Sequence, residues 1–222
     1  MLPWVTLDVA RIPGGGAIRL KRRGSEFSIM LGADELMNSR LSSSEEALAG
    51  IAAKALMDRA APRVLIGGLG MGFTLRAALA AFPQDAAITV AELVPAVIAW
   101  ARGPMSALFD GLLDEARVTI LEADICAVLT SAKASFDAVL LDVDNGPDGL
   151  TTSANDRLYS PSGLAVAHSA LRQGGILAIW SAAPDAAFGR RFGQAGFKVT
   201  ETMVRAHRGK GAKHVIWTGV KG

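Results

Sequence analysis

From residue 63 onward, short apolar segments alternate regularly with segments of helical periodicity. Strands that are covered by helices on both faces are apolar along their whole length, so this alternation is typical of a parallel sheet between two helical layers. The sequence therefore predicts an α/β fold with a doubly wound, seven-stranded sheet. The expected helices lie near residues 73–82, 94–103, 124–132, 155–172 and 184–194. The expected strands are "RVLIGG", "AITVAEL", "RVTILEA", "FDAVLLD", "GGILAIW", "FKVTETMV" and "HVIWTGV".

The last two of these strands are connected differently from the others. Only "RAHRGKGAK" separates them, which is too short for a helical crossover. We therefore expect an antiparallel pair, and with it one reversed terminal strand in the sheet. The basic run itself is typical of a solvated hairpin loop, and the alternative is a lid over an anionic acceptor or over a carboxylate.

The first 41 residues follow another pattern, in which short extended pieces of mixed polarity are separated by "IPGGG", "GS" and "GAD". Gly and Pro between such pieces are typical of hairpins. In "SSSEEALAGIAAKALMDRA", which follows, hydroxyl side chains precede two acids and an Ala/Leu pattern, and this predicts a capped helix. We expect a small N-terminal β segment over residues 1–41 and a main domain over residues 42–222.

Composition excludes several classes of protein. The chain has 222 residues, half of them hydrophobic, and its 23 Lys and Arg residues nearly balance 21 Asp and Glu, so nothing indicates a nucleic-acid partner. Cys126 is the single cysteine, which excludes an internal disulfide and a Cys-rich zinc site. The first residues do not resemble a secretory signal, and no run approaches the ~20 apolar residues of a membrane span. We expect a soluble, cytoplasmic protein.

Three glycines at alternate positions, Gly68, Gly70 and Gly72, follow the first strand of the expected parallel sheet. In doubly wound, Rossmann-like sheets this turn approaches the ligand most closely, and glycine leaves room for it. Glu92 ends the next strand, 20 residues after Gly72, where an acid can accept hydrogen bonds from ribose hydroxyls. Asp124 follows the third strand, within reach of an adenine amino group. Alternatively, Glu92 and Asp124 only cap the helices that follow them.

The spacing G-x-G-x-G, with Phe73 after it, differs from the G-x-G-x-x-G of dinucleotide-binding folds and disfavours a nicotinamide oxidoreductase. It resembles the S-adenosylmethionine-binding turn of class I methyltransferases, whose ligand carries a sulfonium instead of a diphosphate. Neither a G-x-S-x-G elbow nor a P-loop motif is present, and the three histidines show no metal-ligand spacing.

Further along the chain, "GLGMGFTLR", "VAELVPAVIAWAR", "ILEADICAVL", "FDAVLLDVDNGPDG" and "RLYSPSGLAVAHSALRQGGILAIWS" together resemble the spermidine synthase branch of this fold. The resemblance implies a transferase that moves an aminopropyl group from decarboxylated S-adenosylmethionine to a small-molecule amine, and a possible homodimer formed through the N-terminal β segment. The cofactor-binding residues that it implies are Gly68, Gly70, Gly72, Glu92, Leu93, Asp124 and Ile125.

Three aspartates lie in and after the fourth strand, in "LLDVDNGPDG". An amine nucleophile must lose a proton before it attacks, and the resemblance assigns this step to Asp142 as the catalytic residue. It assigns Asp144 to substrate binding, and Tyr159, the single tyrosine, is a second candidate for the same role. The alternative is that Asp144 and Asp148 belong to a simple turn, which Asp, Asn, Gly and Pro all favour.

The chain also departs from the family pattern. Met71 stands in the glycine turn where the synthases have an aspartate, and the tyrosine and glutamine of the family's substrate channel have no match near the first helix. A thioether cannot balance an ammonium group. Two alternatives therefore stay open, an S-adenosylmethionine-dependent methyltransferase and a nucleoside-binding protein without catalytic activity.

Overall fold

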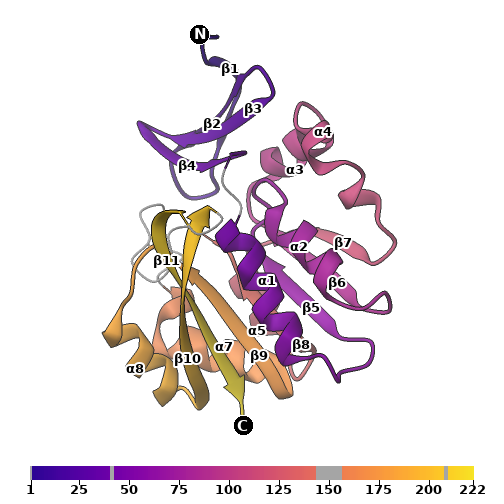
Figure 1. Ribbon diagram of the computed structural model, residues 1–222, viewed down its shortest axis with the longest axis vertical. Helices are drawn as coiled ribbons and strands as arrows, with labels where there is room; N and C mark the ends of the chain where they lie inside the picture. Colours follow the sequence, from indigo (N-terminus) through magenta and orange to yellow (C-terminus); the bar gives the residue numbers. More distant parts are fainter. Residues whose placement is uncertain (1, 41–42, 144–156, 208–209) are drawn as a thin grey trace.

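The computed structural model describes residues 2–40, 43–143, 157–207 and 210–222. Its larger part is a seven-stranded sheet in the order β10-β11-β9-β8-β5-β6-β7, with helices on both faces (Figure 1). The strands are β5 (Arg63–Gly67), β6 (Ala87–Glu92), β7 (Val118–Glu122), β8 (Phe136–Leu141), β9 (Leu171–Ser181), β10 (Phe197–His207) and β11 (Lys210–Lys221).

The five strands from β7 to β9 are mutually parallel, and β11 pairs antiparallel with both β9 and β10. The reversed strand is therefore the last in sequence, and it lies between β9 and β10 in the sheet. This confirms the predicted doubly wound α/β fold and the antiparallel connection of the last two strands.

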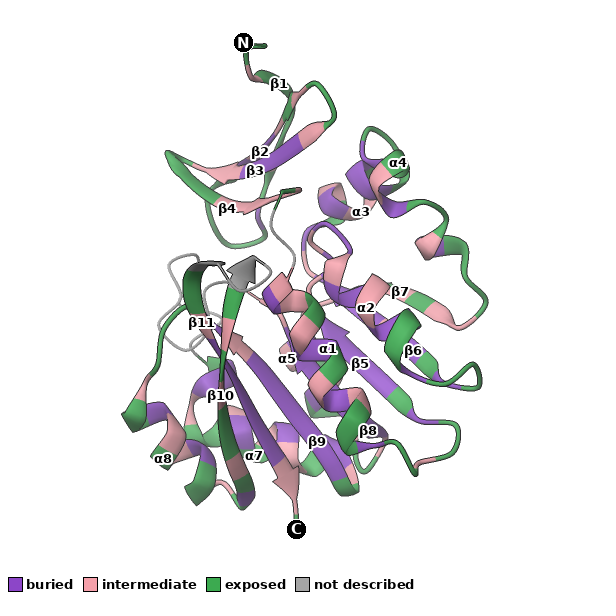
Figure 2. Cartoon of the chain, viewed as in Figure 1, coloured by how far each residue is buried: buried purple, intermediate pink, exposed green. Residues whose placement is uncertain are grey.

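Alternate residues of the central strands contribute to two apolar cores, one on each face of the sheet. Val64 and Ile66 of β5 pack on one face, whereas Leu65 packs on the other, as the pleat requires. Because both faces are covered, all six residues of β8 are buried (Figure 2). The helices are α1 (Ser43–Ala55), α2 (Phe73–Ala81), α3 (Pro95–Arg102), α4 (Ser106–Phe109), η1 (Leu112–Asp114), α5 (Ile125–Ser131), α7 (Pro161–Ala170) and α8 (Ala186–Gln194).

Helix α7 differs from the helix expected at 155–172, of which residues 155 and 156 lie outside the described chain. The Ser160 hydroxyl accepts a hydrogen bond from the Gly163 amide, and Pro161 occupies the first turn, so this helix has its own start. It stops at Ala170 because β9 begins directly at Leu171. Among the described residues, no helix is long and apolar enough to cross a membrane.

The N-terminal segment forms a four-stranded antiparallel sheet in sequential order, packed beside the start of α3 (Figure 1). Trp100 of α3 donates its indole hydrogen bond to Asp8 of β1 at 2.7 Å, which connects the N-terminal sheet to a helix of the main domain. The strands are β1 (Val5–Arg11), β2 (Ala17–Arg23), β3 (Glu26–Leu31) and β4 (Asp34–Asn38).

Asp137 is a buried charge near the amino end of β8, and its removal should measurably lower the stability of the fold. It accepts a hydrogen bond from the Arg63 amide at 2.8 Å and pairs with Arg172 at 3.1 Å. Asp137→Ala leaves these donors without their partner and should lower the free energy of unfolding by about 3 kcal/mol in urea denaturation. Asp114→Ala is the control, because its side chain is 80% exposed and should cost under about 0.5 kcal/mol. Equal effects would contradict this account of Asp137.

Candidate functional site

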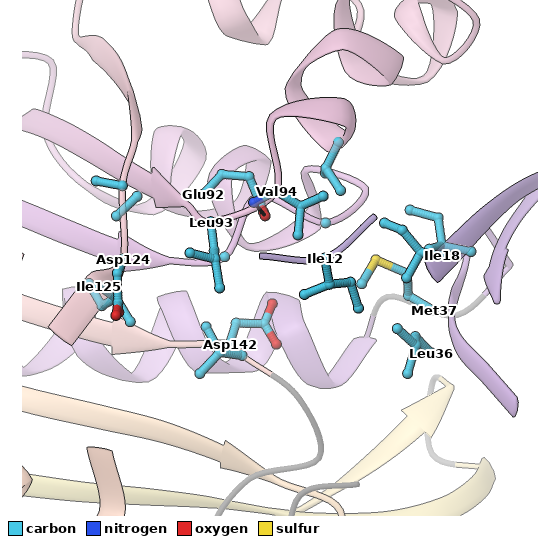
Figure 3. Close-up of a pocket in the computed structure, with 17 residues that line it drawn as sticks. Ile12, Ile18, Leu36, Met37, Glu92, Leu93, Val94, Asp124, Ile125 and Asp142 are labelled. Atoms are coloured by element: carbon cyan, nitrogen blue, oxygen red, sulfur yellow. Dashed lines mark hydrogen bonds between the residues drawn. The ribbon is translucent and has the colours of Figure 1, made fainter. Parts of the chain in front are cut away.

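A cleft opens at the carboxyl ends of the parallel strands, next to the point between β5 and β8 where the strand order reverses (Figure 3). Ligands of doubly wound sheets bind at this position. Its free space, counted together with the open solvent at its mouth, is about 850 Å³. The main sheet and its turns contribute Gly68, Gly70, Ala91, Glu92, Leu93, Val94, Val97, Ala123, Asp124, Ile125, Asp142 and Val143 to the lining.

The glycine turn has a left-handed backbone, with φ of 90° at Gly68 and 51° at Gly70. A Cβ at Gly68 would lie 2.6 Å from the carbonyl oxygen of Asp142, so the ends of β5 and β8 touch only because this side chain is absent. Gly72, which we expected to bind the cofactor, is not among the residues that line the cleft. A Cβ at Gly72 would lie 2.6 Å from the ring of Phe109, so a glycine is needed there for packing.

Glu92 is 8% exposed and connects two loops at the cleft. One carboxylate oxygen accepts the Leu69 amide and the other accepts the Val94 amide, each at 2.8 Å. Burial raises the pKa of Glu92, and the backbone donors oppose this rise. The backbone of Gly70 and of Leu93 also donates to this carboxylate and lowers its pKa. Glu92 therefore braces the glycine turn and the start of α3 while it lines the cleft. Binding of ribose by Glu92 stays a prediction.

Asp124 combines in the same way the two roles that the sequence left open. Its carboxylate caps α5 by accepting the Cys126 amide at 2.8 Å, and the side chain also lines the cleft. Leu93 and Ile125 lie beside it in the lining and supply apolar surface (Figure 3). A helix cap and a ligand contact do not exclude each other, because a carboxylate has two oxygens.

Asp142 is half-buried at the end of β8, and its carboxylate lies between Leu93 and Ile12 (Figure 3). Loss of hydration and the negative charge of Glu45 together raise the pKa of Asp142 to about 7, against the lowering effect of a hydrogen bond from the Thr74 hydroxyl. This carboxyl can therefore accept or release a proton near neutral pH. Thr74, in the first turn of α2, was not among the residues that the sequence singled out.

The remaining candidate residues do not line the cleft. Tyr159 is 2% exposed, and its hydroxyl donates to the Val143 carbonyl at 3.2 Å, so it packs behind the cleft instead of facing it. Met71 is 2% exposed and belongs to the apolar core. Asp144, predicted to bind the substrate, and Asp148 of the same aspartate cluster lie outside the described residues.

The opposite wall of the cleft comes from the N-terminal sheet, and the sequence analysis missed it. Met37 lies over the glycine turn, with its sulfur 3.1 Å from where a Cβ of Gly70 would be. The alternation of polar and apolar residues in β2 and β3 indicates that one face of this sheet is buried. It does not indicate which part of the protein that face covers. The wall consists of Ile12, Ile18, Ile29, Leu36 and Met37.

The charges of the cleft share one sign. Among the described lining residues, the charged side chains are Glu92, Asp124 and Asp142, all of them carboxylates. Their combined field in a partly buried site attracts a cation and repels an anion.

Comparisons with known proteins agree with the predicted resemblance, although no family model matches. A stretch of 124 residues, 54% of the chain, is 36% identical to the polyamine aminopropyltransferases of Mycobacterium tuberculosis (strain ATCC 25618 / H37Rv) and Mycobacterium bovis (strain ATCC BAA-935 / AF2122/97). The match covers 23% of the length of each relative.

Two solved structures share the fold over 98% of this chain, at 18% identity. A spermidine synthase in complex with the transition state analogue AdoDATO gives a TM-score of 0.80 over 74% of its chain, and the spermidine synthase from Thermotoga maritima gives 0.76 over 72%. The resemblance to the spermidine synthase-like family and the fold class are confirmed.

The close approach at Gly68 predicts a specific defect in Gly68→Ala. The new Cβ would collide with the backbone of Asp142, so we expect a larger loss of unfolding free energy than in Gly14→Ala, and at least about tenfold weaker binding of methylthioadenosine by calorimetry. Gly14 is the matched control because its φ is 73° but no atom lies within 4 Å of its Cβ position. Equal stability losses in the two variants would refute the close approach.

The raised pKa of Asp142 predicts how stability changes with pH. From about pH 4 to pH 7 the unfolded chain releases this proton while the folded chain retains it, so Asp142 increasingly destabilises the fold, and above pH 7 the penalty is constant. Asp142→Asn should therefore be more stable than the wild type above pH 7, by about 2 kcal/mol after allowance for partial exposure, and equally stable at pH 4. Urea denaturation at several pH values measures the difference. A constant difference across this range would contradict the pKa.

Proposed function

From the resemblance of this chain to the spermidine synthase-like family, we infer that it is a transferase that moves an aminopropyl group from decarboxylated S-adenosylmethionine to an amine. The observation that carries this proposal is the position of Asp142, a carboxyl with a pKa near neutrality at the glycine turn of a cleft whose described charges are all negative. A cationic co-substrate and an amine acceptor suit such a cleft.

The residues of the cleft fit an adenosine that carries a sulfonium. Gly68 and Gly70 leave the turn bare of side chains, so the ligand can approach the backbone. Glu92 lines the cleft at the end of β6, where a carboxylate can accept from ribose hydroxyls, and Asp124 has an oxygen available for the adenine amino group. These contacts extend to this chain the type of ligand named for the related structure in complex with AdoDATO.

In the proposed reaction, the amine nitrogen attacks the carbon attached to sulfur in the aminopropyl group. The new C–N bond forms as the C–S bond breaks, the electron pair of that bond stays on sulfur, and neutral methylthioadenosine leaves. The proton that the amine loses passes to a carboxylate oxygen of Asp142, whose raised pKa makes it a stronger base than an exposed aspartate.

The aliphatic wall of the N-terminal sheet has a part in this reaction. Ile12, Leu36 and Met37 cover the side of the cleft that faces Asp142, so little water can reach the reacting carbon there. Exclusion of water strengthens the interaction between the carboxylates and the sulfonium and limits competing hydrolysis.

One observation favours a second candidate, an S-adenosylmethionine-dependent methyltransferase. Met71 is buried in the core, so the glycine turn has no acid there for the ammonium group of a decarboxylated co-substrate. Intact S-adenosylmethionine, however, brings a carboxylate into a cleft whose described charged side chains are themselves carboxylates, which disfavours it. The homodimer and the cytoplasmic location expected from the sequence stay predictions.

Incubation of the purified protein with each co-substrate and a panel of small amines tests the proposal by mass spectrometry. We expect a mass gain of one aminopropyl group only with decarboxylated S-adenosylmethionine. A methyl gain with intact S-adenosylmethionine would instead establish the second candidate. Binding of methylthioadenosine without any transfer would exclude both activities.

Asp142→Asn should lower kcat/KM for this transfer by at least about 100-fold, because asparagine cannot accept the proton. In the wild type, kcat/KM should rise with pH through about 7 as Asp142 becomes ionised. Steady-state kinetics between pH 5.5 and 9 measure both effects, and calorimetry with methylthioadenosine verifies that the variant retains its nucleoside site. An Asp142→Asn protein with wild-type kcat/KM would refute the assigned role.

A further inference from the structure

The Asp142 carboxylate is held by one side chain of the described chain, which reaches it from behind the cleft. Thr74 lies in the first turn of α2, and its hydroxyl donates a hydrogen bond to Oδ2 of Asp142. Thr74 is 3% exposed and is not among the residues that line the cleft, so a ligand there meets Asp142 and not Thr74. Any part that Thr74 has in the chemistry must therefore act through Asp142.

The backbone around this contact is fixed on both sides. The Asp142 amide donates to the Gly67 carbonyl at 3.2 Å, and the Asp142 carbonyl lies against Gly68. Thr74 follows the glycine turn by two residues, and a β-branched side chain has few rotamers in a helix. Donor and acceptor thus extend from two rigid segments, the start of α2 and the end of β8. The fold therefore positions this hydrogen bond before a ligand binds.

The hydrogen bond from Thr74 makes the two oxygens of Asp142 different. Among the described residues, Thr74 is the one donor to this carboxylate, and its bond goes to Oδ2. A threonine hydroxyl has a single proton to donate, and the described residues offer that proton no second acceptor. If Oδ2 carried the acidic proton, the hydroxyl would have to turn, and its own proton would be buried without an acceptor. We therefore expect the proton of neutral Asp142 at Oδ1.

The charges around Asp142 leave the Thr74 hydroxyl to oppose them. Loss of hydration and then the charge of Glu45, in the first turn of α1, raise the pKa of Asp142, whereas the Thr74 hydroxyl lowers it. Glu92 and Asp124, which line the same cleft, are acids as well. Thr74 is thus the described group that stabilises the ionised form of Asp142.

His214 of β11 is a titratable group that packs against the same turn of α1. Its Nδ1 atom lies 3.1 Å from the Ser44 hydroxyl oxygen, and the charge of Glu45 acts to raise its pKa. Burial has the larger effect and lowers the pKa of His214 below its ordinary value of 6.5, so the imidazole is neutral at pH 7. It therefore supplies no positive charge that could take over from the Thr74 hydroxyl.

On the basis of the proposed function, we propose that Thr74 is a positioning residue for the transfer: its hydroxyl holds Oδ2 of Asp142, so that Oδ1 is the atom that takes the proton of the attacking amine. The proton moves from the amine nitrogen to Oδ1, and the bonds at carbon change as in the proposed reaction. Thr74 itself gains and loses no atom. A carboxylate that is fixed through one oxygen presents the other in a constant direction, which favours an aligned attack.

Substitutions at Thr74 separate the hydroxyl from the bulk of the side chain. Thr74→Val removes the hydroxyl and keeps a β-branched side chain, whereas Thr74→Ser keeps the hydroxyl. Should Thr74→Val fail to fold, Thr74→Ala replaces it, since alanine also lacks the donor. Thr130→Val is the matched control, because the Thr130 hydroxyl donates to the Cys126 carbonyl at 2.7 Å on α5 and Thr130 does not line the cleft.

Carbon-13 NMR of the aspartate carboxyl groups measures the titration of Asp142 without any turnover. The signal of Asp142 is identified by its loss in Asp142→Asn. We expect a midpoint near pH 7 in the wild type. In Thr74→Val the midpoint should rise by about one pH unit, because a donor to the ionised form is lost. Thr74→Ser and Thr130→Val should stay within about 0.3 of the wild type, because both keep this donor.

Steady-state kinetics with decarboxylated S-adenosylmethionine and a small amine measure the orientation of Asp142. In Thr74→Val, the midpoint of the pH profile of kcat/KM should rise by about one pH unit as well. At pH 9, where the carboxyl is mostly ionised, kcat should still be about tenfold lower, because the carboxylate is no longer aligned. KM and the binding of methylthioadenosine should change less than about twofold, since Thr74 touches neither ligand. Thr74→Ser should restore kcat.

The outcomes separate this inference from the proposed function. An unchanged NMR midpoint in Thr74→Val, or a midpoint that stays raised in Thr74→Ser, would overturn the role of the hydroxyl. A loss of activity at every pH without a shift of the midpoint would show that Thr74 has only a structural role, and the inference would be wrong. A midpoint that rises in Thr74→Val and returns in Thr74→Ser, in a protein that transfers no aminopropyl group, would support the hold on Asp142 and refute the proposed reaction.

Discussion

The contact between the backbone of Gly68 and the carbonyl of Asp142 is the constraint on which the site depends. It brings the ends of β5 and β8 so close that no side chain fits at Gly68, and it fixes the direction in which Asp142 leaves its strand. Glu92 holds the other side of the same turn through the Leu69 amide. The glycine turn is therefore fixed from both sides before any ligand arrives, which lowers the entropy cost of binding.

The carboxyl groups at this edge of the sheet act against folding. Glu92 and Asp142 both have raised pKa values because they lose hydration, so each opposes folding when it is ionised. Backbone amides, among them those of Leu69 and Val94, compensate Glu92, whereas the hydrogen bond from Thr74 compensates Asp142 only in part. The uncompensated carboxyl is the one to which we assign proton transfer, since a fully satisfied carboxylate would be a weak base.

The sequence predicted what depends on local pattern and failed where distant segments meet. Apolar periodicity placed the strands of the main sheet, and the glycine spacing placed the cleft, because both signals lie within a few residues. The aliphatic wall around Met37 and the contact of Ser44 with His214 join parts of the chain that no local pattern connects. Gly72 and Tyr159 show that residues typical of a ligand site also serve packing: Gly72 leaves room for the Phe109 ring, and the Tyr159 hydroxyl donates to the Val143 carbonyl.

The departure of this chain from the spermidine synthase pattern at Met71 changes how the charges of the site can be shared between two amines. With Met71 in the core, the glycine turn supplies no carboxylate of its own at that position, and the acids Glu92 and Asp124 already hold backbone amides. Asp142 is the carboxylate to which the proposed reaction assigns the acceptor's proton. It cannot both neutralise a permanent ammonium group and accept that proton, because such a pairing would lower its pKa. Under the proposed reaction, the charge that fixes a permanent ammonium group must therefore come from another residue.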